Sequence, residues 1–333
     1  MLLALLLLAF VLMAVTLGDR AAARMASETL IRVTLVVGFW IFAGNSGVIS
    51  FGHAAFACVG AYVSAWTTLQ PGMKATLLPG LPEAIADAHW PVLAGAGLAG
   101  TIAAALALVT GAAILRLSGI AASIATFAFL AMINTIWSNW TPITGGTSSV
   151  VGLERYVTPW VALGWAVAAL IAASVYGASA SGLALRASRE DEVAAAASGI
   201  DRYRHRLLAF TLSAFFCGVG GALMGHFIGV INPDGFYLSL TFLMLAMLVV
   251  GDRLALGRGD RGAGGFGHGR AAGAAGKGRH FRRHHLRAAP GSQEILIAIA
   301  MILVLVFRPA GLLAGREIML PARWVTGRSI PKE

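Results

Sequence analysis

Long apolar stretches separated by short polar segments run along the 333 residues of this chain. An α-helix crosses a bilayer with about 20 apolar residues and satisfies its own backbone hydrogen bonds there. We therefore predict helical spans over most of these stretches, which are 1–17, 91–115, 120–137, 160–176, 207–230, 236–250 and 295–307. The pattern predicts an all-α fold, a polytopic transmembrane helical bundle in which residues 1–333 form one domain.

A longer apolar stretch, 33–69, is interrupted near its middle by small and polar residues. Irregular backbone at membrane depth is tolerated only where it is buried in protein or lines a water-filled cavity, and broken helices in transporters can turn backbone groups toward a polar substrate. The interruption is therefore predicted to contribute to a translocation path, through Asn45, Ser46, Gly47, Ser50, Gly52 and His53. The alternative is a packing face, in which small residues allow close helix contact and Ser and Asn bond to neighbouring helices.

A charged, alanine-rich segment at 182–206 separates two apolar stretches and so must lie in water. Its helical propensity predicts a short helix along the membrane surface, with Ser188 as N-cap and Gly199 as left-handed C-cap. Acidic residues suit the first turn, and they are Glu190, Asp191 and Glu192. An excess of arginine marks a cytoplasmic loop, and the arginines here are Arg186, Arg189, Arg202, Arg204 and Arg206. A docking element and an ordinary cytoplasmic loop both fit this pattern.

Two further patterns bear on how the helices are arranged. A stripe of small residues suited to close helix packing lies within 207–230, at Gly218, Gly220, Gly221 and Gly225. Three arginines after the first span are predicted to mark another cytoplasmic loop, and they are Arg20, Arg24 and Arg32. The loop at 70–90 has mixed charges and is predicted on the far side of the membrane.

Composition narrows the class of protein. The chain is 58% apolar and 12% charged, about half the charge of a typical soluble domain. Its mean hydropathy is +0.78. The two cysteines, Cys58 and Cys217, lie in apolar stretches, where a small buried hydrophobe is expected and a disulfide or metal site is not. The cores of the predicted spans hold no Asp or Glu, which disfavours a membrane-embedded enzyme, and no metal or cofactor is predicted.

Three separated segments resemble the permeases of branched-chain amino acid ABC importers, and specifically their M-type subunit. Asn45 to Tyr62 resembles the family's first signature, Ala184 to Asp201 its coupling loop, and Phe307 to Leu312 its C-terminal signature. In that family the coupling loop docks on the ATP-binding subunit. The resemblance thus implies this contact for Arg186, Arg189, Glu190, Asp191, Glu192 and Gly199.

The resemblance also implies the function and the partners. The chain would be a permease subunit in the bacterial inner membrane, working with a second permease, two ABC ATPase subunits and a periplasmic substrate-binding protein. It would contact membrane lipid, and no nucleic-acid partner is expected. The substrates would be branched-chain amino acids, with urea and short amides as alternatives. No ATP-binding motif is present in the chain, as expected if partners hydrolyse the ATP.

The segment 252–290 departs abruptly from this pattern, being rich in Gly, Arg and His. Residues 252–287 carry seven of the ten net positive charges. Its glycine and histidine motifs lack the surroundings of a nucleotide or metal site. A disordered insertion or translation in a shifted frame remains, and the shift would come from paired frameshifts in the gene or from sequencing errors. Suitable GC-rich codons, read one nucleotide later, give a sequence resembling the family's Gly-Ser-Leu-Trp-Gly motif. Restoring one span here would also place the basic C-terminus in the cytoplasm, and an unrepaired frameshift would leave this copy inactive.

Overall fold

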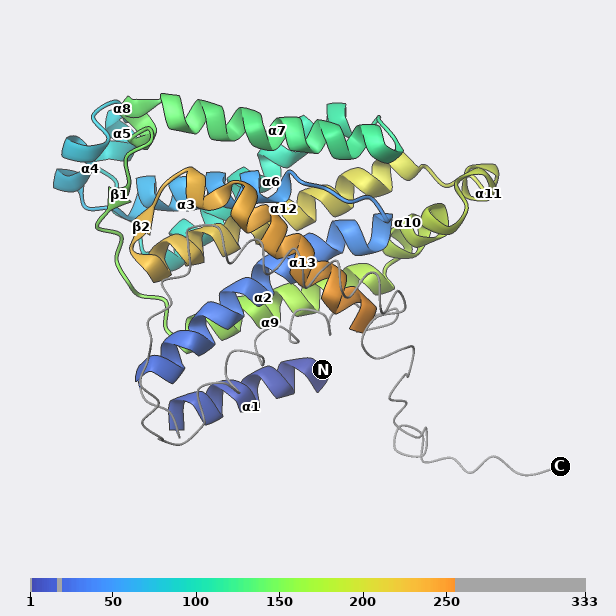
Figure 1. Ribbon diagram of the computed structural model, residues 1–333, viewed down its shortest axis with the longest axis horizontal. Helices are drawn as coiled ribbons and strands as arrows, with labels where there is room; N and C mark the ends of the chain where they lie inside the picture. The colour runs from blue at the N-terminus through green and yellow to red at the C-terminus, as the bar shows by residue number, and fades with distance from the viewer. Residues whose placement is uncertain (1, 17–19, 255–333) are drawn as a thin grey trace, which may run out of the picture.

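The computed structural model describes residues 2–16 and 20–254 (Figure 1). Helices dominate this part of the chain, which confirms the predicted all-α class. Its strands are two short ones, β1 (Val150–Val151) and β2 (Val230–Ile231), which pair antiparallel. Most of the anomalous segment 252–290, the predicted span 295–307 and the C-terminal signature lie outside the described residues.

Within the described residues, five helices are long and apolar enough to cross a membrane, and they make the chain a multi-pass membrane protein. They are α2 (Arg20–Ser46), α6 (Val92–Ile114), α7 (Gly119–Asn139), α9 (Pro159–Ala178) and α12 (Arg202–Ile228). Among the described residues, two shorter apolar helices accompany them, α1 (Leu2–Thr16) and α13 (Leu238–Leu254), and a third short helix, α3 (His53–Thr68), is less apolar. The interruption predicted within 33–69 is confirmed, because α2 ends at Ser46 and α3 begins at His53.

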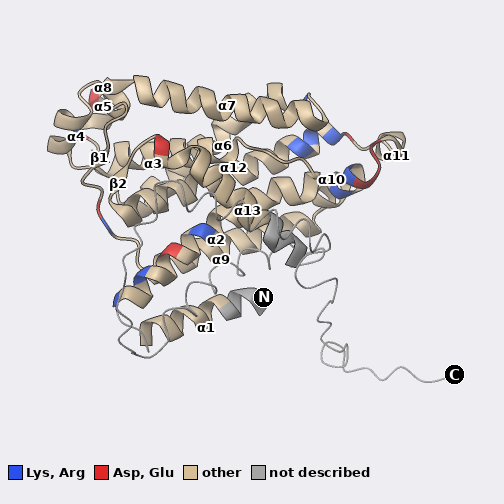
Figure 2. Cartoon of the chain, in the orientation of Figure 1, with Lys and Arg blue, Asp and Glu red and all other residues tan. Residues whose placement is uncertain are grey.

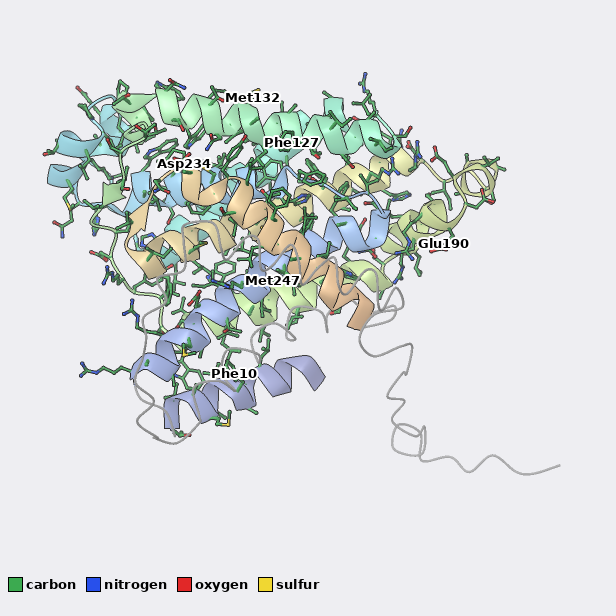
Figure 3. The ribbon with its side chains drawn as sticks, viewed as in Figure 1. Phe10, Phe127, Met132, Glu190, Asp234 and Met247 are labelled. Atoms are coloured by element: carbon green, nitrogen blue, oxygen red, sulfur yellow. The ribbon has the colours of Figure 1, made fainter. Side chains whose placement is uncertain are left out.

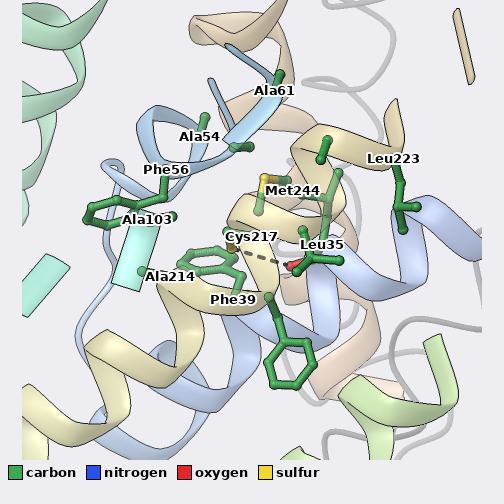
Figure 4. Packing of buried hydrophobic residues seen from close by; sticks show 14 of the residues in the cluster. Leu35, Phe39, Ala54, Phe56, Ala61, Ala103, Ala214, Cys217, Leu223 and Met244 are labelled. Carbon is green, nitrogen blue, oxygen red and sulfur yellow. Dashed lines mark hydrogen bonds between the residues drawn. The ribbon is translucent and has the colours of Figure 1, made fainter. Parts of the chain in front are cut away.

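The central helix is α12, which packs against α2, α3 and α6. Close approach is possible because glycine faces backbone at the α3–α12 crossing. A Cβ built on Gly221 would lie 1.9 Å from the carbonyl oxygen of Ala57, and one on Gly60 would lie 2.1 Å from that of Gly218. The predicted packing role of this stripe is confirmed. Figure 4 shows the core beside it, where the Cys217 thiol faces the Leu35 carbonyl at 3.9 Å.

The two ends of the bundle carry different elements (Figure 1). One end, here the α4 end, holds the short helices α4 (Pro71–Leu77), α5 (Glu83–Ala86) and α8 (Thr141–Thr144), with β1 and β2 nearby. The opposite end, here the α11 end, holds α10 (Ala180–Glu190) and α11 (Glu192–Ala197). The 3₁₀ turn η1 (Asp234–Phe236) follows β2 and leads into α13. Figure 3 accordingly places Glu190 and Asp234 far apart along the bundle.

The prediction that Arg20, Arg24 and Arg32 mark a cytoplasmic loop is wrong. All three belong to α2, whose other end contacts α10, so its arginine-bearing start lies toward the end opposite α11 (Figure 2). The run from Arg20 to Glu28 is rich in alanine and therefore continues the helix. Arg32 forms an ion pair with Glu28 one turn earlier. The number of arginines alone gave no sign that the helix continues through them.

Candidate coupling and translocation site

The charged segment forms two helices where one was predicted, and Ser188 is not an N-cap. Ser188 is buried in α10, and its hydroxyl donates to the carbonyl of Ala184 at 2.9 Å. Ser179 caps α10 by accepting from the Gly182 amide, and Asp191 caps α11 by accepting from the Val193 and Ala194 amides at 2.9 Å each. The extended backbone of Asp191 (φ −146°) separates the helices. The Asp191 carboxylate, which accepts from two amides, is a stronger N-cap than a single serine hydroxyl such as that of Ser188 would be.

The predicted left-handed cap at Gly199 is confirmed. Gly199 has φ +79°, and its amide donates to the Ala196 carbonyl. The next amide, of Ile200, reaches back to the Ala195 carbonyl at 3.1 Å. This pattern satisfies carbonyls that the end of a helix would leave without partners.

The surface of α11 is almost wholly exposed. Between residues 190 and 199 only Ala195 is buried, and Val193 is 80% exposed to solvent. The helix packs mainly on α10 and is tied to α12 by an ion pair between Glu192 and Arg202. It is therefore a firmly capped projection (Figure 1), and its exposed surface is mostly alanine, with Val193 as its largest apolar side chain.

The interruption between α2 and α3 is an extended segment bonded to α7. The Ser123 hydroxyl donates to the Ile49 carbonyl at 2.6 Å, and the Phe51 amide donates to the Thr126 hydroxyl at 3.1 Å. These two residues of α7 were missed by sequence reasoning. Their one signal is spacing, since Ser123 and Thr126 lie three residues apart and so share a helix face. A Cβ on Gly52 would also meet the Thr126 carbonyl at 3.0 Å.

The polar side chains predicted for a translocation path are largely buried against protein. Asn45, Ser46, Ser50 and His53 are all buried. The Ser50 hydroxyl lies 2.9 Å from Nδ1 of His53, and the Ser46 hydroxyl accepts from the Val48 amide. The His53 ring is surrounded by the rings of Phe39, Phe42, Phe56 and Phe210, at centroid distances of 4.6–6.0 Å.

Two buried polar atoms in this region lack a hydrogen-bonding partner within the described residues. They are Oδ1 of Asn45 and Nε2 of His53, whereas Nδ2 of Asn45 donates to the Ile41 carbonyl. Buried polar groups without partners are rare and costly in folded proteins. Such atoms suit a segment that exchanges partners when the bundle changes conformation or admits a polar solute.

The structure brings the two predicted sites together at Arg189. Nη1 of Arg189 donates to the Gly44 carbonyl at 2.7 Å, and its side-chain methylenes cover Gly47. By contrast, Arg186 of α10 donates to the carbonyl of Gly177, near the end of the preceding helix α9. Of the six residues predicted to contact an ATPase, Asp191 serves as a cap and Glu192 pairs with Arg202, while Glu190 is 72% exposed.

A second buried polar cluster near the α4 end was also missed. His226 near the end of α12 lies with Nε2 2.9 Å from the Ser64 hydroxyl and Nδ1 3.0 Å from the Glu154 carbonyl. The cluster fixes the segment before α9 to α3 and α12. Among the described residues, no group of three or more His, Cys, Asp and Glu side chains is placed to hold a metal ion.

The described residues thus form a multi-pass helical bundle with a capped, exposed helix pair at one end and a bonded break beside it, which fits a membrane transport protein. Comparison with known sequences agrees. Residues 21–275 match the family described as branched-chain amino acid transport system / permease component, and the chain belongs to this family.

Individual relatives are moderately similar. The chain is 28% identical over 267 residues to the high-affinity branched-chain amino acid transport system permease protein LivM of Escherichia coli, an alignment covering 70% of this chain and 59% of LivM. It is 27% identical over 235 residues to the corresponding LivH of the same organism, covering 64% of this chain and 73% of LivH. The chain thus spans less than two thirds of LivM. No solved structure matches the chain.

Proposed function

We propose that the chain is a permease subunit of an ABC importer that carries branched-chain amino acids across a bacterial inner membrane. The exposed, doubly capped α11 carries this proposal, since a permease driven by separate ATPases needs a rigid element outside the membrane on which they dock. Family membership and the printed function of LivM and LivH support the choice of solute. The whole chain, 1–333, would then be one permease domain with 182–206 as its cytoplasmic coupling loop.

The docking surface would combine apolar and acidic groups. Val193 is 80% exposed, which is unfavourable for an aliphatic side chain that faces water and favourable for one that a partner covers. The exposed carboxylate of Glu190 lies beside it, at the end of α10. We assign the contact with the ATPase to this face of α11, and the cap Asp191, the ion pair of Glu192 with Arg202 and the Gly199 turn to its shape.

The break between α2 and α3 would belong to the translocation path. ATP-driven closure of the partner subunits would move α10 and α11, and the motion would rock the helices between arrangements open to either side. The residues that change surroundings in this cycle would be Asn45, Ser46, Gly47, Ser50, Gly52 and His53. The backbone groups of Ile49 and Phe51, which lie between these residues, would replace bonds to α7 with bonds to a passing solute or water.

The remaining partners follow from the same proposal. ATP would be hydrolysed by two ATPase subunits and not by this chain, a binding protein would deliver the solute at the α4 end, and the C-terminus would lie in the cytoplasm. A second permease would cover part of the exposed apolar surface, which includes Ile120, Ile124 and Val109 on α6 and α7. Lipid would cover the rest.

A substitution at the docking face tests the proposal. Val193→Asp should reduce co-purification of the ATPase subunits with the full chain, because a carboxylate would be buried in the contact. Val151→Asp is the matched control, since Val151 is also an exposed valine but lies in β1 at the opposite end. Equal recovery of the ATPase with both variants would remove α11 from the contact.

Uptake tests the solute. The full chain, expressed with its partner subunits in cells that lack branched-chain amino acid uptake, should import labelled leucine. Import of labelled urea in place of leucine would favour the urea and short-amide alternative. An assembled complex that imports neither would favour an inactive, frameshifted copy.

A further inference from the structure

We propose that Arg189 is an internal positioning residue that links the docking element to the break between α2 and α3. The inference rests on the proposed function and refines it. Sequence reasoning assigned Arg189 to the partner contact, whereas its guanidinium is turned toward this chain's own backbone.

The contacts of the guanidinium set its position from two sides. Nε and Nη2 of Arg189 donate to the same carboxylate oxygen of Glu190, at 3.1 and 2.7 Å. Nη1 donates to the Gly44 carbonyl at 2.7 Å, in the last turn of α2, where carbonyls have no partner within the helix. A cation at this place also complements the negative end of the helix dipole. One side chain thereby joins the exposed Glu190 to the end of α2.

The stem of Arg189 covers the first residue of the break. Gly47 has φ +69°, which favours glycine, and a Cβ added there would lie 2.6 Å from Cγ and 2.8 Å from Cδ of Arg189. Glycine therefore serves two needs at once, the left-handed turn that ends α2 and the room for the arginine stem. Any other residue at position 47 would push Arg189 away from Gly44.

The break connects the end of α2, which Arg189 contacts, to α7. From Gly47 the extended segment is bonded to α7 through Ile49 and Phe51, and it ends at His53 among four phenylalanine rings. A displacement of α10 would thus move the end of α2 and the break together. The exposed Glu190 is the point at which a partner can change the hold of Arg189, because both compete for one carboxylate.

Transport per ATP hydrolysed is the direct test. In the reconstituted complex, Arg189→Ala should keep ATPase binding and hydrolysis but lower leucine import per ATP by about tenfold or more, as expected for losing hydrogen bonds to a charged group. Arg189→Lys should restore part of the coupling, since one amine can reach Gly44 but cannot hold Glu190 with two donors. Arg116→Ala is the control, an exposed arginine of the α6–α7 connection.

Two results would overturn the inference. Unchanged import per ATP in Arg189→Ala would show that the link carries no coupling. Loss of ATPase binding in the same variant would assign Arg189 to the partner contact instead. Absence of import by the wild-type complex would count against the proposed function alone. The link through Arg189 can still be tested in that case, by a second measurement on the chain without its partner subunits.

Amide hydrogen exchange on the full chain in detergent is that second measurement. Arg189→Ala and Gly47→Ala should both speed exchange in peptides covering residues 44–52, and Arg116→Ala should not. Gly47→Ala acts from the opposite side of the same contact but also strains the left-handed turn at position 47, so the comparison of Arg189→Ala with Arg116→Ala decides the inference. Exchange unchanged from wild type in Arg189→Ala would overturn the link.

Discussion

A methyl group added at Gly221 should separate the two helices at the centre of the bundle. The added Cβ would lie 1.9 Å from the carbonyl oxygen of Ala57 and 2.6 Å from its carbonyl carbon. Since carbon and oxygen normally approach to about 3.3–3.6 Å even in close contacts, α3 and α12 would have to move apart by roughly 1.5 Å. Backbone cannot yield as a flexible side chain does, so the whole crossing would loosen.

The cost can be bounded from packing. Overfilling a close-packed interior costs about 1–3 kcal/mol, and the separation would also weaken the contact between Gly60 and Gly218 on the same face. Alanine has a higher helix propensity than glycine by about 1 kcal/mol, which opposes the loss. The matched control Gly97→Ala, in α6, isolates the clash because a Cβ there meets no atom within 4 Å.

Thermal unfolding of the purified full chain in detergent measures the difference. Gly221→Ala should melt roughly 2–12 °C below Gly97→Ala, from about 2–4 °C for each kcal/mol in domains of 150–250 residues. Equal melting temperatures for the two variants would refute the close approach of α3 and α12 and with it the account of the bundle's centre.

Three further predictions concern the ends of the bundle and the break. Asp191→Ala should destabilise α11 by about 1 kcal/mol through loss of its cap and speed amide exchange there, whereas Ser198→Ala should have little effect; equal exchange would contradict the cap. Ser123→Ala combined with Thr126→Val should lower leucine import by removing two hydrogen bonds of the break, each worth about 0.5–1.5 kcal/mol, and unchanged import would make those bonds incidental. Burial lowers the pKa of Lys74, with Asp87 opposing, so the unfolded chain binds more protons below pH 10.5 and stability should rise with pH toward that value. The change in melting temperature from pH 7.5 to 9.5 should be more positive in wild type than in Lys74→Met, and an equal change in the two proteins would contradict this contribution of Lys74.

Local patterns in the sequence were enough for much of the fold. Apolar length predicted the spanning helices α6, α7, α9 and α12, whereas the stretches 1–17 and 236–250 form helices of only 15 and 17 residues. Interruption by Asn45 and Gly47 predicted the break, and the glycine stripe predicted the crossing at Gly221. Each of these features depends on neighbours along the chain or on one helix face. The left-handed turn at Gly199 is of the same kind, because only glycine adopts it without strain.

The errors and omissions have a common physical cause. Ser188 has the right chemistry for a cap, yet a preceding helix extends through it and leaves the role to Asp191. The contact between Arg189 and Gly44 joins residues 145 positions apart, and Ser123 meets Ile49 across 74. Such pairs are decided by how helices pack, and spacing along the chain gives no sign of them.

Cysteine cross-linking tests the central claim, that α11 is the surface on which the driving ATPase docks. Both native cysteines, Cys58 and Cys217, are buried, so a single Val193→Cys substitution adds an accessible thiol. In membranes containing the full chain and its partners, a short bifunctional reagent should join this thiol to an ATPase subunit, and Val151→Cys should give no such product. A complex that imports leucine while position 193 stays free of cross-links to the ATPase would contradict the account.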